Sequence, residues 1–152
     1  MVVFFSLLFL IAPLCLLLHE CGHALLARSA GAERVEVFLG VGPAYQMQVH
    51  PSFSIHIASL YFLGAMASYD KQDVFKPGER IAISLGGPLF SLGGAVLSWG
   101  SYLYFPHPIL SFMIIFNLWL FAVNLIPFKI RGKRSDGSLI LQDLIGILRK
   151  SS

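Results

Sequence analysis

The sequence predicts a mainly helical membrane protein that also carries a small β-sheet. The 152-residue chain is 56% hydrophobic and 12% charged, whereas an average soluble domain has roughly 25% charged residues. Its mean hydropathy is +0.73. Three apolar segments are each long enough to cross a bilayer, which takes about 20 residues, and the stretch between the first two alternates apolar with polar residues, as strands do. The chain is too short for a second sizeable core, so we expect one domain over residues 1–152.

The first apolar segment covers residues 2–27 and carries a metal-binding motif near its end. The motif is His19-Glu20-Cys21-Gly22-His23, and residues 2–18 before it contain no charged side chain. On a helix, residues four apart share a face, so His19 and His23 can reach one tetrahedral zinc ion while Glu20 flanks its open position. A histidine pair with a carboxylate is costly at that depth unless it binds something. We expect one Zn²⁺ per chain, with Glu20 as the general base.

A signal peptide is the alternative interpretation of this first segment, because Ala30-Gly31-Ala32 resembles a small-residue cleavage site. The segment lacks a basic region before its apolar run, and the run is longer than the usual length of about 7 to 15 residues. Cleavage would also remove the histidine motif. We therefore expect the segment to remain as the first membrane span.

The second span is expected at residues 81–104 and the third at residues 108–128, with the tight turn Phe105-Pro106-His107 between them. Small residues recur in the second span at three-then-four spacing, which lets helix backbones approach closely in lipid. We expect this face to pack against a neighbouring helix, and a groove for a substrate helix is the alternative. The small residues are Ser84, Gly87, Ser91, Gly94, Ser98 and Ser101.

Basic residues set the expected orientation in the membrane. All 11 Lys and Arg residues follow the first span or the third, and none lies in the turn between the second and third. By the positive-inside rule, the loop at residues 31–80 and the C-terminus are cytoplasmic and the N-terminus is outside. We expect an integral, multi-pass protein of a prokaryotic cell membrane, with a site that opens to the cytoplasm. The net charge of +3 fits this topology, so the lipid bilayer is an expected partner and nucleic acid is not.

The loop at residues 31–80 is expected to form a β-meander near the cytoplasmic mouth of the site. Apolar and polar residues alternate over residues 35–39 and 53–58, and turns are expected at residues 40–43 and 50–52, which contain glycine and proline. An unpaired edge of such a sheet could hold an extended substrate by strand addition. His50 and His56 are expected in the sheet or on its surface, since their spacing matches no metal motif.

Two polar residues near and after the end of the third span are candidates for the same site. Asn124 lies about 24 Å down the third span and His19 about 26 Å down the first, so the two reach the same level. A catalytic zinc site usually has three protein ligands, and Asp136 is the candidate for the third. The alternatives are an N-cap role for Asp136, before an amphipathic helix at residues 138–150, and a helix-bridging role for Asn124, as we expect for Asn117.

These motifs resemble those of the site-2 protease family of intramembrane zinc metalloproteases. That family combines HExxH on one transmembrane helix with Asn-x-x-Pro and a later Asp-Gly, and this chain has Asn124-Leu125-Ile126-Pro127 followed by Asp136-Gly137. The resemblance covers nearly the whole chain. It implies that His19, His23 and Asp136 bind zinc, that Glu20 activates the bound water, and that Asn124 helps to hold the substrate carbonyl or the oxyanion.

Two features depart from the family pattern. The segment Gly87-Pro88-Leu89-Phe90-Ser91 ends in serine where the family commonly has asparagine, which leaves one polar contact with the substrate open. A basic insertion at residues 129–135 also lengthens the connection between Pro127 and Asp136.

The expected function is therefore that of an intramembrane zinc metalloendopeptidase. Its substrates would be single-span membrane proteins, or remaining signal and pro-peptide segments, cut near the cytoplasmic side. The alternative from a different class is a catalytically silent membrane protein that binds or assembles with partners. A metal transporter would need an acidic or histidine-rich path through all three spans, and the sequence has none.

Overall fold

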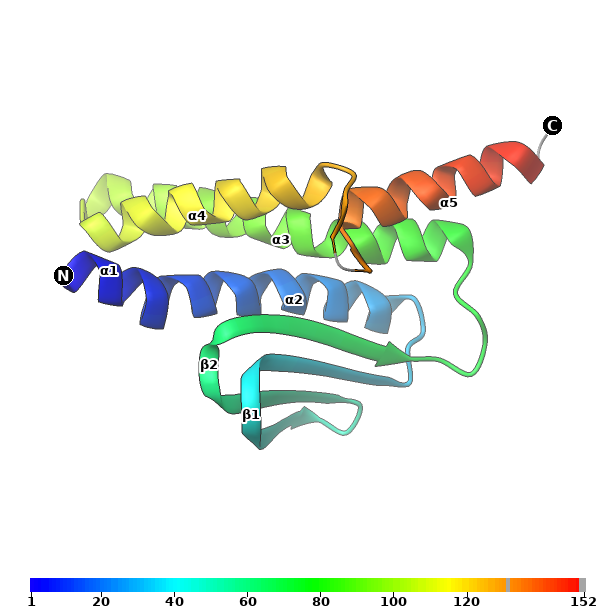
Figure 1. Cartoon of the computed structure of the whole chain (residues 1–152), viewed down its shortest axis with the longest axis horizontal. Coiled ribbons are helices and arrows are strands. Elements are labelled where there is room, and N and C mark those ends of the chain that lie inside the picture. Colours follow the sequence, from blue (N-terminus) through cyan, green and yellow to red (C-terminus); the bar gives the residue numbers. More distant parts are fainter. Residues whose placement is uncertain (131, 151–152) are drawn as a thin grey trace.

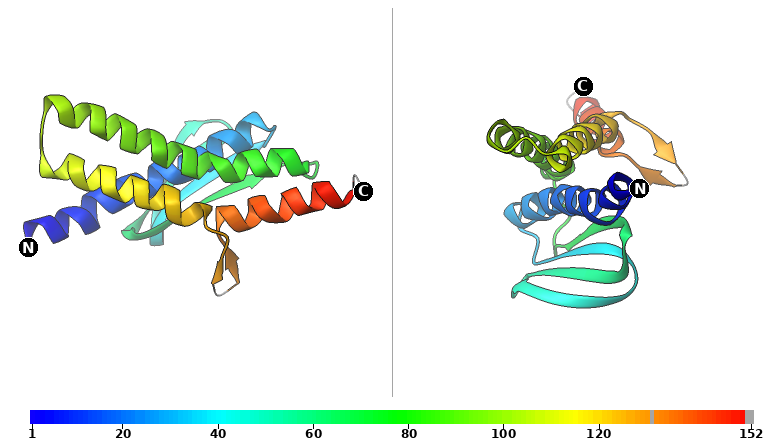
Figure 2. Two further views of the ribbon diagram at one scale, coloured as in Figure 1. Left: turned by 90° about the horizontal axis from the view of Figure 1, so that it is seen from above. Right: turned by 90° about the vertical axis from the view of Figure 1, so that its left-hand side faces the viewer.

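The computed structural model describes residues 1–130 and 132–150, and its elements lie in three layers (Figure 1). A β-hairpin covers one side of the N-terminal helix, and the other long helices lie on its opposite side (Figures 1 and 2). The elements are, in chain order, α1 (Val2–Ser6), the π-helical η1 (Leu7–Ile11), α2 (Ala12–Ser29), β1 (Arg34–His50), β2 (Phe53–Asp70), α3 (Pro77–Tyr104), α4 (Pro108–Leu125), β3 (Lys129–Ile130), β4 (Lys133–Arg134) and α5 (Asp136–Lys150).

The three predicted apolar helices are confirmed. Within the described part of the chain, three helices are long and apolar enough to cross a membrane, as judged from length and composition. The first combines most of α1 with η1 and α2, and the other two are α3 and α4. Their ranges are Phe4–Ser29, Pro77–Tyr104 and Pro108–Leu125.

The ends of α3 and α4 differ from the prediction for local reasons. α3 begins before residue 81, because the Glu79 carboxylate accepts a hydrogen bond from the Lys76 N–H at 2.8 Å and so caps an additional turn. α4 ends at Leu125 and does not reach residue 128. The reason is Pro127, which holds the preceding Ile126 in an extended conformation with φ −70° and ψ 125°.

A proline in the N-terminal helix creates an attachment point for the hairpin. Pro13 has no N–H, so the carbonyl of Phe9, four residues earlier, lacks its usual helical donor. The hydroxyl of Tyr61 in β2 donates a hydrogen bond to this carbonyl at 3.0 Å. The rings of Phe9 and Phe62 also meet edge to face, with their centroids 4.8 Å apart. These contacts fasten the hairpin to the helix beside its π-helical turn.

Glycines let α2 and α3 approach each other closely. A Cβ atom on Gly22 would lie 2.3 Å from the Gly86 carbonyl oxygen, and one on Gly86 would lie 2.5 Å from the Gly22 oxygen. Any side chain at either position would push the two backbones apart. Ser84, Ser91 and Ser98 are buried on the same side of α3. The prediction that this face packs against a neighbouring helix is confirmed.

The predicted meander of short strands is wrong, because β1 and β2 are two long strands of one antiparallel hairpin. The turn at residues 51–52 is as expected. Gly40 and Gly42, with φ of 89° and 106°, bend β1 without ending it. The hairpin therefore folds over on itself, so residues 34–39 lie between two segments of β2. On one side they pair with residues 65–70. On the other side they pair with residues 53–57, and there the residue numbers increase in the same direction in both segments. Residues 65–70 thus form a strand segment that the alternation pattern did not reveal.

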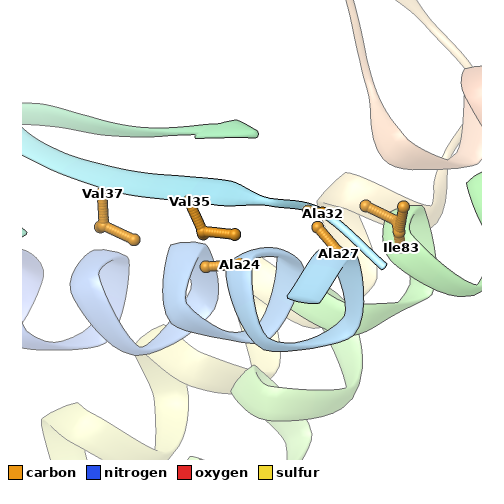
Figure 3. Packing of buried hydrophobic residues seen from close by; sticks show 6 residues of the cluster. All are labelled: Ala24, Ala27, Ala32, Val35, Val37 and Ile83. Atoms are coloured by element: carbon orange, nitrogen blue, oxygen red, sulfur yellow. The ribbon is translucent and has the colours of Figure 1, made fainter. Parts of the chain in front are cut away.

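The apolar core between the sheet and the helices is small and well defined (Figure 3). Val35 and Val37 project from β1 onto Ala24 of α2, and all three are fully buried. The alternation of β1 explains this, since every second side chain faces the helix. This core holds the first half of the hairpin against α2, whereas residues 41–50 are exposed.

The C-terminal helix α5 starts at Asp136, earlier than the predicted residue 138, and packs along the first half of α3 (Figure 1). An ion pair joins the two helices, in which Arg80 Nε lies 3.0 Å from both carboxylate oxygens of Asp143. Asp143 is buried, so the helix lies against the helical core. The short strands β3 and β4 form a second hairpin between α4 and α5, which projects from the helices (Figure 2).

Candidate metal centre and active site

Three side chains from two separate helices converge on one point. His19 and His23 are one helical turn apart on α2, and Asp136 is the first residue of α5. The two Nε2 atoms lie 3.2 Å apart. Asp136 Oδ2 is 3.4 Å from the Nε2 atom of His19, and Asp136 Oδ1 is 3.4 Å from that of His23. Among the described residues, these three form a group whose ligand atoms lie within 4.8 Å of one another.

The donor set fits a zinc ion. Zinc bound at about 2.0–2.1 Å in tetrahedral geometry separates neighbouring ligand atoms by roughly 3.3 Å, which matches the distances of 3.2 and 3.4 Å in this group. Asp136 Oδ2 is buried and has no hydrogen-bond partner among the described residues. A buried carboxylate oxygen without a partner is costly, and a cation at this point would remove that cost.

The two imidazoles are oriented from behind by α3. His23 Nδ1 lies 2.8 Å from the carbonyl oxygen of Ile83, which can only accept, so Nδ1 carries the proton and the Nε2 lone pair faces the cluster. His19 Nδ1 lies 2.9 Å from the hydroxyl of Ser91. Sequence reasoning treated Ser91 as a departure in a substrate contact, whereas the structure places it behind a histidine. Its seven-residue spacing from Ser84 marked only a packing face.

Gly87 of α3 leaves the space that the imidazoles occupy. A Cβ atom on Gly87 would lie 2.2 Å from His23 Nε2 and 2.6 Å from His19 Nε2. Even alanine would therefore displace both rings. Gly87 was predicted as a packing residue, and the structure places it against the two histidine side chains.

Glu20 and Asn124 line the same cavity as the three candidate ligands. This cavity has a volume of about 420 Å³. The Glu20 carboxylate accepts a hydrogen bond from the Ala67 N–H of β2 at 2.7 Å, which holds it at the sheet edge. The Asn124 side-chain amide donates to the Leu120 carbonyl of its own helix at 2.9 Å. It therefore does not bridge helices through that group.

Asn117 does bridge two helices, as predicted. Its amide lies 3.1 Å from Cys15 Sγ of α2 and also donates to the Met113 carbonyl at 3.0 Å. The two other histidines that were considered lie away from the cluster. His50 is beside Ser52 in the hairpin turn, and His56 is in the sheet, 3.6 Å from a carboxylate oxygen of Glu36.

The N-cap of α5 is Ser135, which leaves the Asp136 carboxylate available to the histidines. Ser135 Oγ accepts from the Ser138 N–H at 3.2 Å and from the Phe128 N–H at 3.0 Å. It donates to the Ile126 carbonyl at 2.7 Å. Burial disfavours the ionised form of Asp136, but its contacts with the two histidines outweigh this and lower its pKa. The carboxylate is therefore ionised at neutral pH, as a metal ligand must be.

Gly137 explains why glycine follows the candidate ligand. A Cβ atom on Gly137 would lie 2.0 Å from the Leu125 carbonyl oxygen at the end of α4. With glycine, the start of α5 can press against the end of α4. The insertion between the two helices thus leaves Asp136 beside the histidines.

A histidine pair of an HExxH motif that meets a carboxylate as the third candidate ligand, in an apolar helical fold, defines a candidate metalloprotease. A family model described as peptidase family M50 matches residues 4–107. This is more than half of the chain, so the chain belongs to peptidase family M50, the site-2 protease family of membrane-embedded metalloproteases. The resemblance inferred from the sequence is confirmed. Asn124 and Asp136 lie beyond the matched segment, and no curated protein matched the chain.

Proposed function

We propose that this protein is a zinc metalloendopeptidase that cuts peptide bonds within or next to the membrane-spanning segments of other proteins. The observation that carries the proposal is the convergence of three buried ligand atoms beside a carboxylate in one cavity. Membership of peptidase family M50 supports the same reaction class. His19, His23 and Asp136 would hold the zinc ion, and one ion per chain satisfies the set.

Glu20 and Asn124 have separate chemical tasks in the proposed reaction. At this site a bound zinc ion would supply Lewis-acid chemistry and would lower the pKa of a bound water to about 7. Glu20 stands on the cavity wall and takes a proton from the attacking water, which it passes to the leaving nitrogen of the cut peptide bond. Asn124 would hold the substrate carbonyl, because its amide lies on the wall of the same cavity. Ser91 and Ile83 keep the histidines in place during the reaction.

The edge of β2 is the proposed support for the substrate. Residues 65–67 line the cavity, and the N–H of Ala67 already bonds to Glu20. A transmembrane helix must unwind before its peptide bond can be cut, and an extended segment can pair with a strand edge. Suitable substrates are single-span membrane proteins or remaining signal and pro-peptide segments.

The proposed orientation has the site open to the cytoplasm. The distribution of basic residues supports it, since all 11 Lys and Arg residues lie on one side. Cysteine labelling tests it. Gln72→Cys, in the loop before α3, should react with an impermeant reagent only after the membrane is opened, and Phe105→Cys should react from outside. The unchanged chain gives the background from the native cysteines, and the reverse labelling pattern would contradict the orientation.

Metal analysis and a cleavage assay test the proposed reaction together. The purified protein should carry about one zinc ion per chain and cut at least one member of a panel of co-expressed single-span proteins. Glu20→Gln should retain zinc and lose cleavage, because the amide cannot accept a proton. Glu33→Gln, an exposed acidic residue outside the cavity, is the matched control and should keep full activity. Cleavage by the Glu20→Gln protein would overturn the mechanism, and zinc binding without any cleavage would favour a silent binding protein.

A further inference from the structure

A basic hairpin stands at the mouth of the cavity. It consists of the paired strands β3 and β4, and it follows α4 and precedes Asp136. Its described basic residues are Lys129, Lys133 and Arg134, and all three are exposed. The hairpin lies within the insertion that separates Pro127 from Asp136, so it is additional to the residues that form the metal site.

The basic side chains of this hairpin have no partner within the described residues. Among the described residues, no side-chain hydrogen bond or ion pair involves any of the three, whereas Lys71 and Arg80 elsewhere are paired with acidic groups. Acidic residues that could neutralise them lie on other elements and are already engaged. Glu79 contacts Lys71, and Asp143 contacts Arg80. The side chains of Lys129, Lys133 and Arg134 therefore carry positive charge that no ion pair among the described residues offsets.

Two of the three cations face the proposed active site, and the third does not. Lys133 and Arg134 line the cavity that contains Glu20 and Asp136. Lys129 pairs with Arg134 across the hairpin but does not line that cavity. The floor of the cavity is therefore acidic and its mouth is basic. A ligand that enters with its acidic part at the mouth would match this arrangement.

The hairpin is held at its base, so its charges have a defined place relative to the candidate ligand. The Ser135 N–H donates to the Phe128 carbonyl at 3.1 Å, and the Ser135 hydroxyl donates to the Ile126 carbonyl at 2.7 Å. These bonds close the hairpin directly before Asp136. A short, closed connection loses less conformational freedom on binding than an open loop, which favours recognition by these two cations.

We propose that Lys133 and Arg134 select substrates by their acidic residues. These acidic residues lie just beyond the substrate's apolar segment, on the part of the substrate that extends out of the membrane from the cut bond. This inference rests on the proposed function and adds to it the substrate class. The hairpin follows the end of the apolar helix α4, so it stands at the level where a substrate would leave the apolar layer. Binding to anionic lipid headgroups would instead use all three exposed cations alike, and only two of them line the cavity.

The test compares three versions of one single-span substrate that differ in the five residues after the apolar stretch, which are acidic, amide or basic. The protein is assayed in vesicles with and without an anionic phospholipid. The acidic version should be cut about fivefold to tenfold faster than the basic one, measured as kcat/KM, since two partly exposed charge pairs contribute on this order. In the variant Lys133→Glu with Arg134→Glu, the order of the acidic and basic versions should reverse. Lys129→Gln, on the same hairpin, removes a positive charge without placing a carboxylate opposite Arg134, and it should keep the original preference.

Binding provides a readout that does not require cleavage. The three versions are cross-linked to the Glu20→Gln protein, with and without the double substitution. Equal binding of the three versions would overturn the inference whether or not the unchanged protein cleaves. Suppose instead that the acidic version binds best, in a way that depends on Lys133 and Arg134, while no version is cleaved. That result would sustain the inference and overturn the proposed protease function. If Lys129→Gln loses the preference as fully as the double substitution does, or if the preference depends on anionic lipid alone, the hairpin would be assigned to the membrane surface.

Discussion

The floor and the mouth of the cavity are built in opposite ways. On the floor, His19 and His23 are 4% and 9% exposed, and the imidazole of each has a fixed partner on α3. At the mouth, Lys133 and Arg134 are exposed, and their side chains have no hydrogen-bond or ion-pair partner within the described residues. The floor therefore depends on how closely α2, α3 and α5 pack, whereas the mouth can change without disturbing that packing. Substitutions should abolish function at the floor and alter preference at the mouth.

The largest effect is expected from Gly87→Ala. A Cβ atom there would lie 2.2 Å from His23 Nε2, so the added methyl group must displace the imidazoles. We expect zinc content to fall to near zero and cleavage to disappear, as measured by metal analysis and the single-span assay. Gly93→Ala on the same helix is the control, because no atom lies within 4 Å of its added methyl group. Full zinc content in Gly87→Ala would show that the floor is less tightly packed than the distances indicate.

The second-largest effect distinguishes the metal-ligand role of Asp136 from the helix-capping role of Ser135 at the start of α5. Asp136→Ala should remove most of the bound zinc and the activity while changing the stability of the fold little, because its carboxylate does not cap the helix. Ser135→Ala should reduce stability by about 0.5–2 kcal/mol, as loss of an N-cap does. Zinc content and thermal unfolding of both variants check this. Normal zinc in Asp136→Ala, together with a clear loss of stability, would return Asp136 to the role of a cap.

A smaller effect is expected for Ser91 of α3, which contacts the candidate ligand His19 but is not itself a ligand. Ser91→Ala removes the hydroxyl that lies 2.9 Å from His19 Nδ1, so the affinity for zinc should fall by about 10- to 100-fold. Competition with a chelator of known affinity measures this change. Ser98→Ala is the matched control, since Ser98 is also a buried serine of α3 and has no hydrogen bond to a histidine among the described residues. If both variants lose affinity equally, packing of the serine face explains the result better than orientation of His19.

The smallest effect should come from the contact that holds α5 on α3. Arg80→Ala leaves the buried Asp143 without its partner, and we expect α5 to loosen by about 1–2 kcal/mol. Hydrogen exchange of the α5 amides should increase, while zinc binding falls only a few-fold. Arg149→Ala, an exposed residue near the end of α5, should change neither. Unchanged exchange in Arg80→Ala would mean that apolar contacts alone fix the helix.

The sequence indicated that His19 and His23 lie together on the floor because the signals for this are local. The four-residue spacing of His19 and His23 places them on one face of a helix, and helix length alone put Asn124 at the level of His19. The groups behind the histidines were not predictable in the same way. Ile83 contributes a backbone carbonyl, which any residue has, and the hydroxyl of Ser91 looked like part of a packing face.

The sheet was predicted less well because its pairing is long-range. Gly40 and Gly42 indicated a chain break, but their positive φ only bends the strand. Residues 65–70 carry alanine, serine and methionine without clear alternation, so their pairing with residues 34–39 left no local pattern. The third span was predicted too long for a related reason, since its apolar composition continues past the residue at which Pro127 ends the helix.

Proline in the N-terminal helix has one more consequence. Apolar contacts such as those between Val35 and Ala24 are interchangeable along a helix, so they would allow the sheet to slide by a turn at little cost. The hydrogen bond from the Tyr61 hydroxyl to the Phe9 carbonyl does not permit this, because Pro13 has removed the usual helical donor of that particular carbonyl. The proline thus sets the position of the sheet along the helix. That position in turn determines which backbone amide of β2 contacts Glu20.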